Sequence, residues 1–248
     1  MNEIIRTAFV LIAVASIGIG MAATSGRAAD HSKAIEDQVE KLEKKVRRLE
    51  AKLANVKVVE NPINGLAGPH LVFEGCNVHV RSGSGDTEDS GTPSGLGNLI
   101  LGYNEPTTGS DLGRTGSHNL IVGPGHSFPE IAGVLFGVEN IAFGRYATAT
   151  GGYRNGAWGD YSSVSGGSTN FATGDKSSVG GGENNEALGN FSSISGGKYN
   201  DTVGLHSTVT GGFLNIANGN YSSVSGGNAR ETTSSAYGWA AGALYQDN

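Results

Sequence analysis

The sequence predicts an all-β repeat fold, a parallel β-solenoid that follows a short α-helical coiled coil. Glycine makes up 41 of the 248 residues and proline only 6, without the Gly-X-Y period of collagen. A fifteen-residue block recurs through the second half of the chain, and a seam of apolar residues at heptad spacing precedes it. These three observations favour many thin stacked layers over one large globular core.

The fifteen-residue period is the strongest signal in the chain. Seven successive blocks run from Ile131 to Ser235, and the block that starts at Tyr161 reads YSSVSGGSTNFATGD. In the six blocks from Tyr146 onwards, position 2 is small, position 10 is usually Asn and position 12 is usually Ala. Position 4 is always apolar: Ala149, Val164, Val179, Ile194, Val209 and Val224. Positions 6 and 7 are always glycine: Gly151, Gly152, Gly166, Gly167, Gly181, Gly182, Gly196, Gly197, Gly211, Gly212, Gly226 and Gly227.

Each block has room for two short strands with a turn after each. Gly-Gly makes one turn, and Gly followed by Asp or Asn makes the other. Successive coils stacked about 4.8 Å apart satisfy each other's backbone hydrogen bonds. We expect the position-4 residues to form the thin core of the roll, and we expect association between chains to support it, because so narrow a column is weakly stable alone.

Upstream of these blocks the spacing lengthens. Asn98, Asn119 and Asn140 each begin a similar apolar segment that ends in Gly, and they lie 21 residues apart. We expect earlier coils here with six extra loop residues each. Insertions on one side of a solenoid often mark its working face.

The predicted coiled coil lies in a charged segment near the N-terminus. Its apolar residues follow one another at alternating spacings of four and three: Ile35, Val39, Leu42, Val46, Leu49, Leu53 and Val56. This spacing is the a/d seam of a coiled coil, so we expect these residues to form an interface between chains. A solitary amphipathic helix packed on the body is the alternative.

The seam leaves the number of strands open. Val at a with Leu at d favours two strands. The stretch from Lys45 to Glu50 reads KVRRLE and resembles the basic-hydrophobic-x-x-hydrophobic-Glu signature of trimeric coiled coils.

The first residues are typical of an export signal, because Arg6 precedes an apolar run from Ala8 to Ala23 that is short for a membrane-spanning helix. An uncleaved N-terminal anchor is the alternative. We expect Trp239, Leu244 and Tyr245 to close the last coil. The predicted order is a signal peptide (1–28), a coiled-coil stalk (30–58), a linker with a strand that leads into the repeats (59–97), the β-roll repeats (98–235) and a C-terminal cap (236–248).

The repeated S-S-V-S-G-G…N-x-A-x-G pattern resembles the head repeats of trimeric autotransporter adhesins. The resemblance covers roughly residues 98–235 and implies a left-handed parallel β-roll, three rolls about one axis, and a surface that serves adhesion or self-association. It also implies that these position-4 residues line either the roll or the trimer interface: Val164, Val179, Ile194, Val209 and Val224. Three features differ from that family: the period is mostly fifteen rather than fourteen, the stalk precedes the head, and no C-terminal outer-membrane barrel segment follows. Outer-membrane anchoring therefore does not follow from the resemblance.

The charge of the chain and its cysteine and histidine residues argue against several classes of function. Residues 61–248 carry seven basic and fifteen acidic side chains, which argues against binding to nucleic acid. The only cysteine, Cys76, and six histidines without ligand spacing predict no metal site and no cofactor. We expect Asp86, Glu88 and Asp89 to be solvated in a Ser/Gly loop, and His206 to stack at a surface position.

We therefore expect a non-enzymatic, exported structural or adhesion-like module, homotrimeric, that contacts a cell surface or matrix. Its partners are a second and third copy of the chain and an unidentified surface, glycan or matrix ligand, and a membrane only if the N-terminal segment stays uncleaved. The alternative is an ice-binding or carbohydrate-binding solenoid that uses Ser/Thr columns at positions 3 and 5, for example Ser163 with Ser165. An enzyme on a solenoid scaffold is the weakest reading, because the repeat offers no aligned acids.

Overall fold

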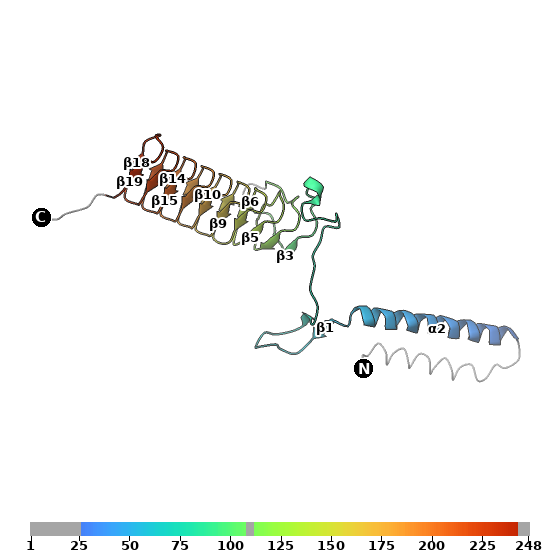
Figure 1. Ribbon diagram of the computed structural model, residues 1–248. Helices are drawn as coiled ribbons and strands as arrows, with labels where there is room; N and C mark the ends of the chain where they lie inside the picture. Colours follow the sequence, from blue (N-terminus) through green and yellow to red (C-terminus); the bar gives the residue numbers. More distant parts are fainter. Residues whose placement is uncertain (1–25, 108–111, 243–248) are drawn as a thin grey trace. The chain divides into compact units, whose positions relative to one another are not determined.

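The structure is a computed structural model that describes residues 26–107 and 112–242 (Figure 1). The chain divides into two compact units, Met1–Val78 and His79–Asn248. The predicted signal peptide lies outside the described residues, apart from its last three positions.

The described residues of the first unit form one helix and one hairpin. Helix α2 spans Gly26–Lys52, and strand β1 (Val56–Val59) pairs antiparallel with β2 (His70–Phe73). The helix is predicted correctly over most of its length, but the seam ends earlier than its period suggests. Leu53 lies in the turn after α2, and Val56 begins β1.

Backbone chemistry explains the early end of the helix. The sequence Val-Lys-Val-Val is β-branched at three of four positions, which favours an extended strand over a further helical turn. The Glu74 amide also donates to the Asn55 carbonyl at 2.9 Å, so the partner strand holds this segment in the hairpin. Val56 is therefore a strand residue rather than the last position of the stalk, and the helix stops at Lys52 instead of residue 58.

The second unit is a parallel β-solenoid, which confirms the predicted fold class (Figure 1). Two sheets run along it. The ten-stranded sheet contains β3 (Leu99–Leu101), β4 (Leu120–Val122), β5 (Val134–Phe136), β7 (Thr148–Ala149), β9 (Ser163–Val164), β11 (Ser178–Val179), β13 (Ser193–Ile194), β15 (Thr208–Val209), β17 (Ser223–Val224) and β19 (Trp239–Ala240). The seven-stranded sheet contains β6 (Ile141–Ala142), β8 (Gly156–Ala157), β10 (Phe171–Ala172), β12 (Glu186–Ala187), β14 (Asp201–Thr202), β16 (Ile216–Ala217) and β18 (Glu231–Thr232). A 3-10 turn, η1 (Asp89–Gly91), precedes both sheets.

The position-4 residues form the interior of the solenoid. Each of the six is at most 1% exposed and packs within its own chain. In the ten-stranded sheet they stack in register, as Val164 on Val179 and Val179 on Ile194. Ala at position 12 of the seven-stranded sheet faces them from the other side. The first of the two expected roles is therefore correct, and a position-4 interface between chains is wrong, because one chain already buries this column.

A ladder of buried asparagines at position 10 links the coils. Asn170 shows the pattern: its Oδ1 accepts the amide of Asn185 at 3.1 Å, and its Nδ2 donates to the carbonyls of Gly166 and Gly182. The same set recurs at Asn155, Asn185, Asn200 and Asn215, all fully buried. Each side chain thus joins the Gly-Gly turn of its own coil to the next coil, which satisfies backbone groups that would otherwise be buried without partners.

The second glycine of each Gly-Gly pair is required by both conformation and space. Gly167 has a φ of +85°, in the left-handed region that favours glycine, and a side chain there would collide with the carbonyl oxygen of Gly182 in the next coil. The first glycine of this same pair is different. Gly166 is not left-handed, and a methyl group on it would meet no neighbouring atom.

Two predictions at the ends of the solenoid need correction. Strand β4, which follows Asn119, pairs with β5 at an offset of 14 residues, and Asn140 precedes a strand of the other sheet. Only Asn98 and Asn119 are thus related by the 21-residue coil. At the C-terminal end, β19 continues the ten-stranded sheet and Trp239 is 71% exposed, so it does not close the coil. Leu244 and Tyr245 lie outside the described residues.

We predict that Gly167→Ala destabilises the solenoid by at least about 2 kcal/mol, since it combines a left-handed backbone with a clash against the next coil. The matched control Gly166→Ala should change the free energy of unfolding by less than about 0.5 kcal/mol. Chemical denaturation of both variants measures the difference. Equal effects at the two positions would contradict the assignment of the inter-coil contact to the second glycine.

Candidate functional site

The apolar seam of α2 is exposed in this chain. Leu42 is 60% exposed and Leu49 is 50% exposed, and Ile35 and Val46 are also exposed, whereas Val39 is half-buried. Charged side chains flank the seam at Glu43, Lys45 and Glu50. On the opposite side of the helix, Lys44 and Glu40 form an ion pair of 2.6 Å. An apolar stripe with charged borders is the surface that helices use to associate with one another.

The hairpin that follows α2 also has an apolar face. Val56 pairs with Phe73 and Val58 pairs with Leu71, so the four side chains lie on the same side of the two strands. Three of them are about half exposed or more. On the same hairpin, the ammonium of Lys57 forms an ion pair with Glu74.

The outer face of the ten-stranded sheet is small and polar. Positions 3 and 5 alternate with the buried position 4 and therefore point outwards. In five of the six regular coils both positions are Ser or Thr, and Gly180 is the exception: the columns are Thr148, Ser163, Ser178, Ser193, Thr208 and Ser223, and Thr150, Ser165, Gly180, Ser195, Thr210 and Ser225. The structure thus aligns the predicted Ser/Thr columns as two parallel rows, since Ser163, Ser178 and Ser193 pair in register.

The outer face of the seven-stranded sheet has the opposite character. Here positions 11 and 13 point outwards, and apolar side chains recur among them: Ile141, Phe143, Trp158, Phe171, Leu188, Val203 and Ile216. The rings of Phe143 and Trp158 stack with centroids 5.0 Å apart. We call this set the apolar column. Phe143, Leu188 and Val203 of this set are exposed and the others are half-buried. A group of exposed apolar side chains on one face is typical of an interaction surface.

Two carboxylates interrupt the apolar column. Asp201 and Glu186 are neighbours on adjacent strands, and both are half-buried. Burial, followed by repulsion from Glu186, raises the pKa of the Asp201 carboxyl above its ordinary value. The ionised form of Asp201 is therefore disfavoured in the folded chain.

A third surface runs along one edge of the solenoid, at position 1. Each of these residues has a left-handed backbone, with φ between 55° and 59° from Tyr146 to Tyr221. Their side chains stack: Tyr146 on Tyr161 at 5.0 Å, and His206 between Phe191 and Tyr221 at 4.7 and 5.1 Å. Since the rings cover each other's faces, mainly their edges meet the solvent. The interpretation of His206 as a stacking residue is confirmed.

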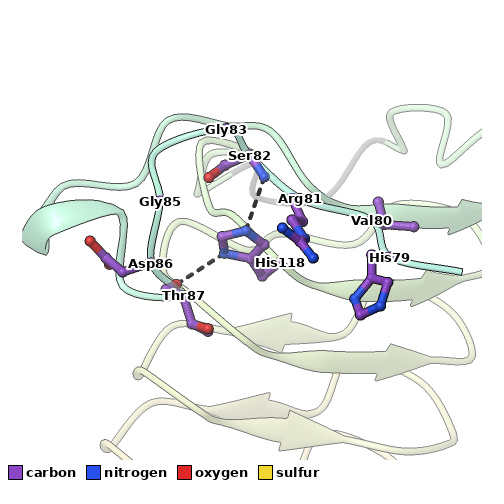
Figure 2. A pocket seen from close by; sticks show the side chains of 9 residues that line it. All are labelled: His79, Val80, Arg81, Ser82, Gly83, Gly85, Asp86, Thr87 and His118. Atoms are coloured by element: carbon purple, nitrogen blue, oxygen red, sulfur yellow. Dashed lines mark hydrogen bonds between the residues drawn. The ribbon is translucent and has the colours of Figure 1, made fainter. Parts of the chain in front are cut away.

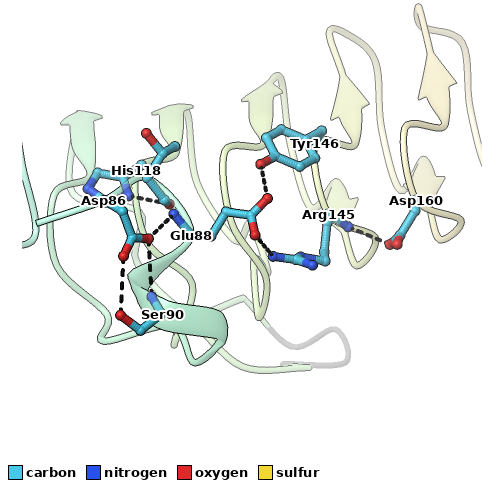
Figure 3. A network of polar contacts seen from close by, with 8 residues as sticks. Asp86, Glu88, Ser90, His118, Arg145, Tyr146 and Asp160 are labelled. Carbon is cyan, nitrogen blue, oxygen red and sulfur yellow. Dashed lines mark hydrogen bonds and ion pairs between the residues drawn. The ribbon is translucent and has the colours of Figure 1, made fainter. Parts of the chain in front are cut away.

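At the start of this edge, a loop of residues 82–91 is tied to the coils. His118 binds it from below: its Nε2 accepts the Ser82 amide at 3.0 Å, and its Nδ1 donates to the Thr87 carbonyl at 2.9 Å. Glu88 extends along the edge and accepts the Tyr146 hydroxyl at 2.7 Å, with the Arg145 guanidinium at 3.1 Å from its other oxygen (Figure 3). These contacts hold the pKa of Glu88 below its usual value.

Asp89 anchors the same loop from within. Its carboxylate is 6% exposed and accepts the hydroxyls of Ser84 and Ser94, both at 2.6 Å, and that of Ser82. Hydrogen bonds from serine hydroxyls, with Ser117 contributing most, hold the pKa of Asp89 far below its ordinary value. The expectation that Asp89 is solvated is therefore wrong, whereas Asp86 and Glu88 are exposed as expected.

The loop also borders a cavity of about 510 Å³. Figure 2 shows the side chains of His79 and Arg81 beside the ring of His118, with Asp86 and Thr87 further along the loop. Every lining residue belongs to the second unit of the chain. The predicted surfaces did not include this cavity, because the stretch 79–87 and the distant His118 form it together.

Within the described residues, no group of three or more His, Cys, Asp and Glu is placed to hold a metal ion. None of the helices in that part of the chain is long and apolar enough to cross a membrane. Comparison with known proteins finds no family model that matches the chain and no curated protein that matches it. The resemblance to adhesin head repeats therefore rests on the repeat pattern and on the solenoid itself.

We predict that Asp201→Asn raises the melting temperature at pH 7. The pKa of Asp201 is higher in the folded chain than in the unfolded chain, so folding takes up a proton and stability falls as pH rises from about 4 through the raised value. The Asn variant is free of this loss.

The advantage of Asp201→Asn should shrink as the pH falls below about 4, where the carboxyl is protonated in both states. Thermal unfolding between pH 3 and pH 7 measures it. The control is Asp175→Asn, at an exposed position where the next coil already has Asn190. A stabilisation by Asp201→Asn that does not depend on pH would contradict burial of the ionised carboxyl as its cause.

Proposed function

We propose that this chain is an exported, non-enzymatic structural module that assembles as a homotrimer through its N-terminal helix and presents the β-solenoid for contact with a cell surface or matrix. The observation that carries the proposal is the exposed seam of α2, on which Leu42 and Leu49 are each at least half exposed. Partner helices that bury this seam stabilise it by about 25 cal/mol per Å² of apolar surface.

The trimeric state is favoured over the dimeric one by two features. The stretch from Lys45 to Glu50 matches the charge pattern of trimeric coiled coils, and the apolar column on the seven-stranded sheet offers a second contact between neighbouring solenoids. In such an assembly the outer face of the ten-stranded sheet stays free. We assign the contact with an external surface to this small, polar face.

A structural role also agrees with the places of the reactive side chains. His126 is fully buried: its Nε2 donates to the Val122 carbonyl, its Nδ1 accepts the Asn140 amide, and burial lowers its pKa. His206 is stacked between two rings. His118 has both nitrogens engaged in holding the loop. These histidines serve the fold, which supports the proposal of a non-catalytic protein.

Export is the part of the proposal that depends on sequence alone. Arg6 and the apolar run from Ala8 to Ala23 support it. A solenoid that faces the exterior can then meet other cells, a matrix or a glycan coat. We propose adhesion as the function by analogy with the adhesin heads that the repeats resemble.

The alternative function, ice or carbohydrate binding, is favoured by one observation. The Ser/Thr rows on the ten-stranded sheet are regular in both directions, set by the strand spacing of about 4.8 Å and by the pleat of each strand. A thermal-hysteresis assay separates ice binding from the main proposal, since a contact module produces no gap between freezing and melting.

We predict that the intact chain has three times the mass of a single chain in solution, and that Leu42→Asp with Leu49→Asp reduces it to the mass of one chain. Buried carboxylates at d positions oppose association strongly, because each must be desolvated. Multi-angle light scattering measures the mass.

The matched control adds carboxylates to the opposite side of the helix, as Lys44→Asp with Ala51→Asp, and should leave the mass unchanged. A single-chain mass for the unaltered protein would refute self-association. A dimer would refute the trimeric state alone, and a seam variant that keeps its mass would place the interface elsewhere.

A further inference from the structure

The cavity at the start of the solenoid has walls that are rigid before any ligand arrives. His118 binds both ends of the loop segment from Ser82 to Thr87, and Asp89 accepts one hydroxyl from within that segment, at Ser84, and one from beyond it, at Ser94. A site held in this way loses little conformational entropy on binding. None of the surfaces used in the proposed function includes it.

Arg81 is the free cation of this cavity. The described residues show no ion pair for its guanidinium, whereas three of the other basic side chains of the same unit pair with a glutamate. The solenoid is acidic overall, and Arg81 is the only Lys or Arg among the residues that line this cavity. His79 lies on the same side and adds a second nitrogen donor (Figure 2). This end of the cavity suits a negatively charged group.

The other end of the cavity suits hydroxyl groups. The Asp86 carboxylate accepts the amides of Glu88 at 2.8 Å and Ser90 at 3.1 Å, and the Ser90 bond does most to keep the pKa of Asp86 below its ordinary value. Asp86 is exposed, so its oxygens retain room for further donors. Thr87 lies beside it.

The middle of the cavity offers flat and open surfaces. Both nitrogens of His118 are occupied, which leaves the face of its ring for contact with an apolar patch of a ligand. Gly83 and Gly85 border the same space without side chains. A volume of about 510 Å³ is within the range of small-molecule sites.

We propose that this cavity binds an anionic saccharide, with its carboxylate or sulfate on Arg81 and His79 and its hydroxyls on Asp86 and Thr87. A free inorganic anion fits less well, because it gains nothing from Asp86 and is repelled by that carboxylate. The proposal does not depend on self-association or on the Ser/Thr rows.

The test measures binding of saccharides to the full chain by saturation-transfer NMR and calorimetry. The probes are trigalacturonate, sialyllactose and a heparin-derived tetrasaccharide, with maltotriose and lactose as neutral counterparts and sodium sulfate as the free anion. At least one anionic saccharide should bind at least tenfold more tightly than its neutral counterpart and than sulfate.

Arg81→Gln should weaken that binding at least tenfold, and Asp86→Asn should weaken it for the saccharide without weakening the binding of sulfate. Arg154→Gln is the control, since Arg154 is paired with Glu139 away from the cavity, and it should have no effect. Folding of each variant is checked by its melting temperature.

The proposal fails if no anionic saccharide binds at millimolar concentration, if sulfate binds as tightly as the saccharide, or if Arg81→Gln binds as the unaltered chain does. The light-scattering mass of the same sample separates this failure from a failure of the homotrimer proposal, because a trimer without saccharide binding refutes only the cavity.

Discussion

The close stacking of one coil on the next is the constraint on which the rest of this structure depends. Each coil buries only a few small residues, so it has almost no core of its own. The Asn ladder joins the Gly-Gly turn of one coil to the next, and Gly167 and its equivalents allow the backbones to approach. In place of a large apolar core, the chain has a repeated set of buried asparagines, and both the oxygen and the nitrogen of each side chain are hydrogen-bonded.

Because small residues fill the coils, the side chains available for contact with other molecules lie on the outer faces of the solenoid. The interior is filled by Val or Ile at position 4, Asn at position 10 and Ala at position 12, which leaves no room for a buried site. Every coil instead adds one residue to each outward column, so surface chemistry repeats along the solenoid. The two sheets differ sharply, with Ser and Thr on one face and the apolar column on the other. In the proposed function, the apolar column serves association and the Ser/Thr face meets an external partner.

The sequence predicted the structure correctly where a residue pattern is compatible with only one structure. The apolar position 4 and the Gly-Gly pairs predicted the coil, its turns and its interior. It failed where two structures share a pattern. Val56 continues the heptad spacing but belongs to a strand, and Asn140 continues the 21-residue spacing but precedes the other sheet. The alternative of a trimer interface at position 4 failed for a related reason, since a buried apolar column has the same sequence pattern within a chain as between chains.

Other features had no readable signal. Asparagine is usually a turn or surface residue, so complete burial of Asn170 and its equivalents is not evident from composition. The recurrence of Asn at the same position in five blocks was the available signal. The cavity beside His118 was beyond prediction from sequence, because Arg81 and His118 meet only after the loop folds onto the coils. Asp89 likewise reads as a solvated loop acid until its serine partners are placed around it.

Amide hydrogen exchange of the full chain tests the ladder most directly. The backbone amides of Asn170, Asn185, Asn200 and Asn215 donate to the side chain of the preceding ladder residue, so they should exchange as slowly as the position-4 strand amides. Protection that is high at these asparagines and low at the exposed Asn190 is the predicted result. Rapid exchange at the ladder amides, with slow exchange confined to the strands, would show that the asparagines do not hold the coils together.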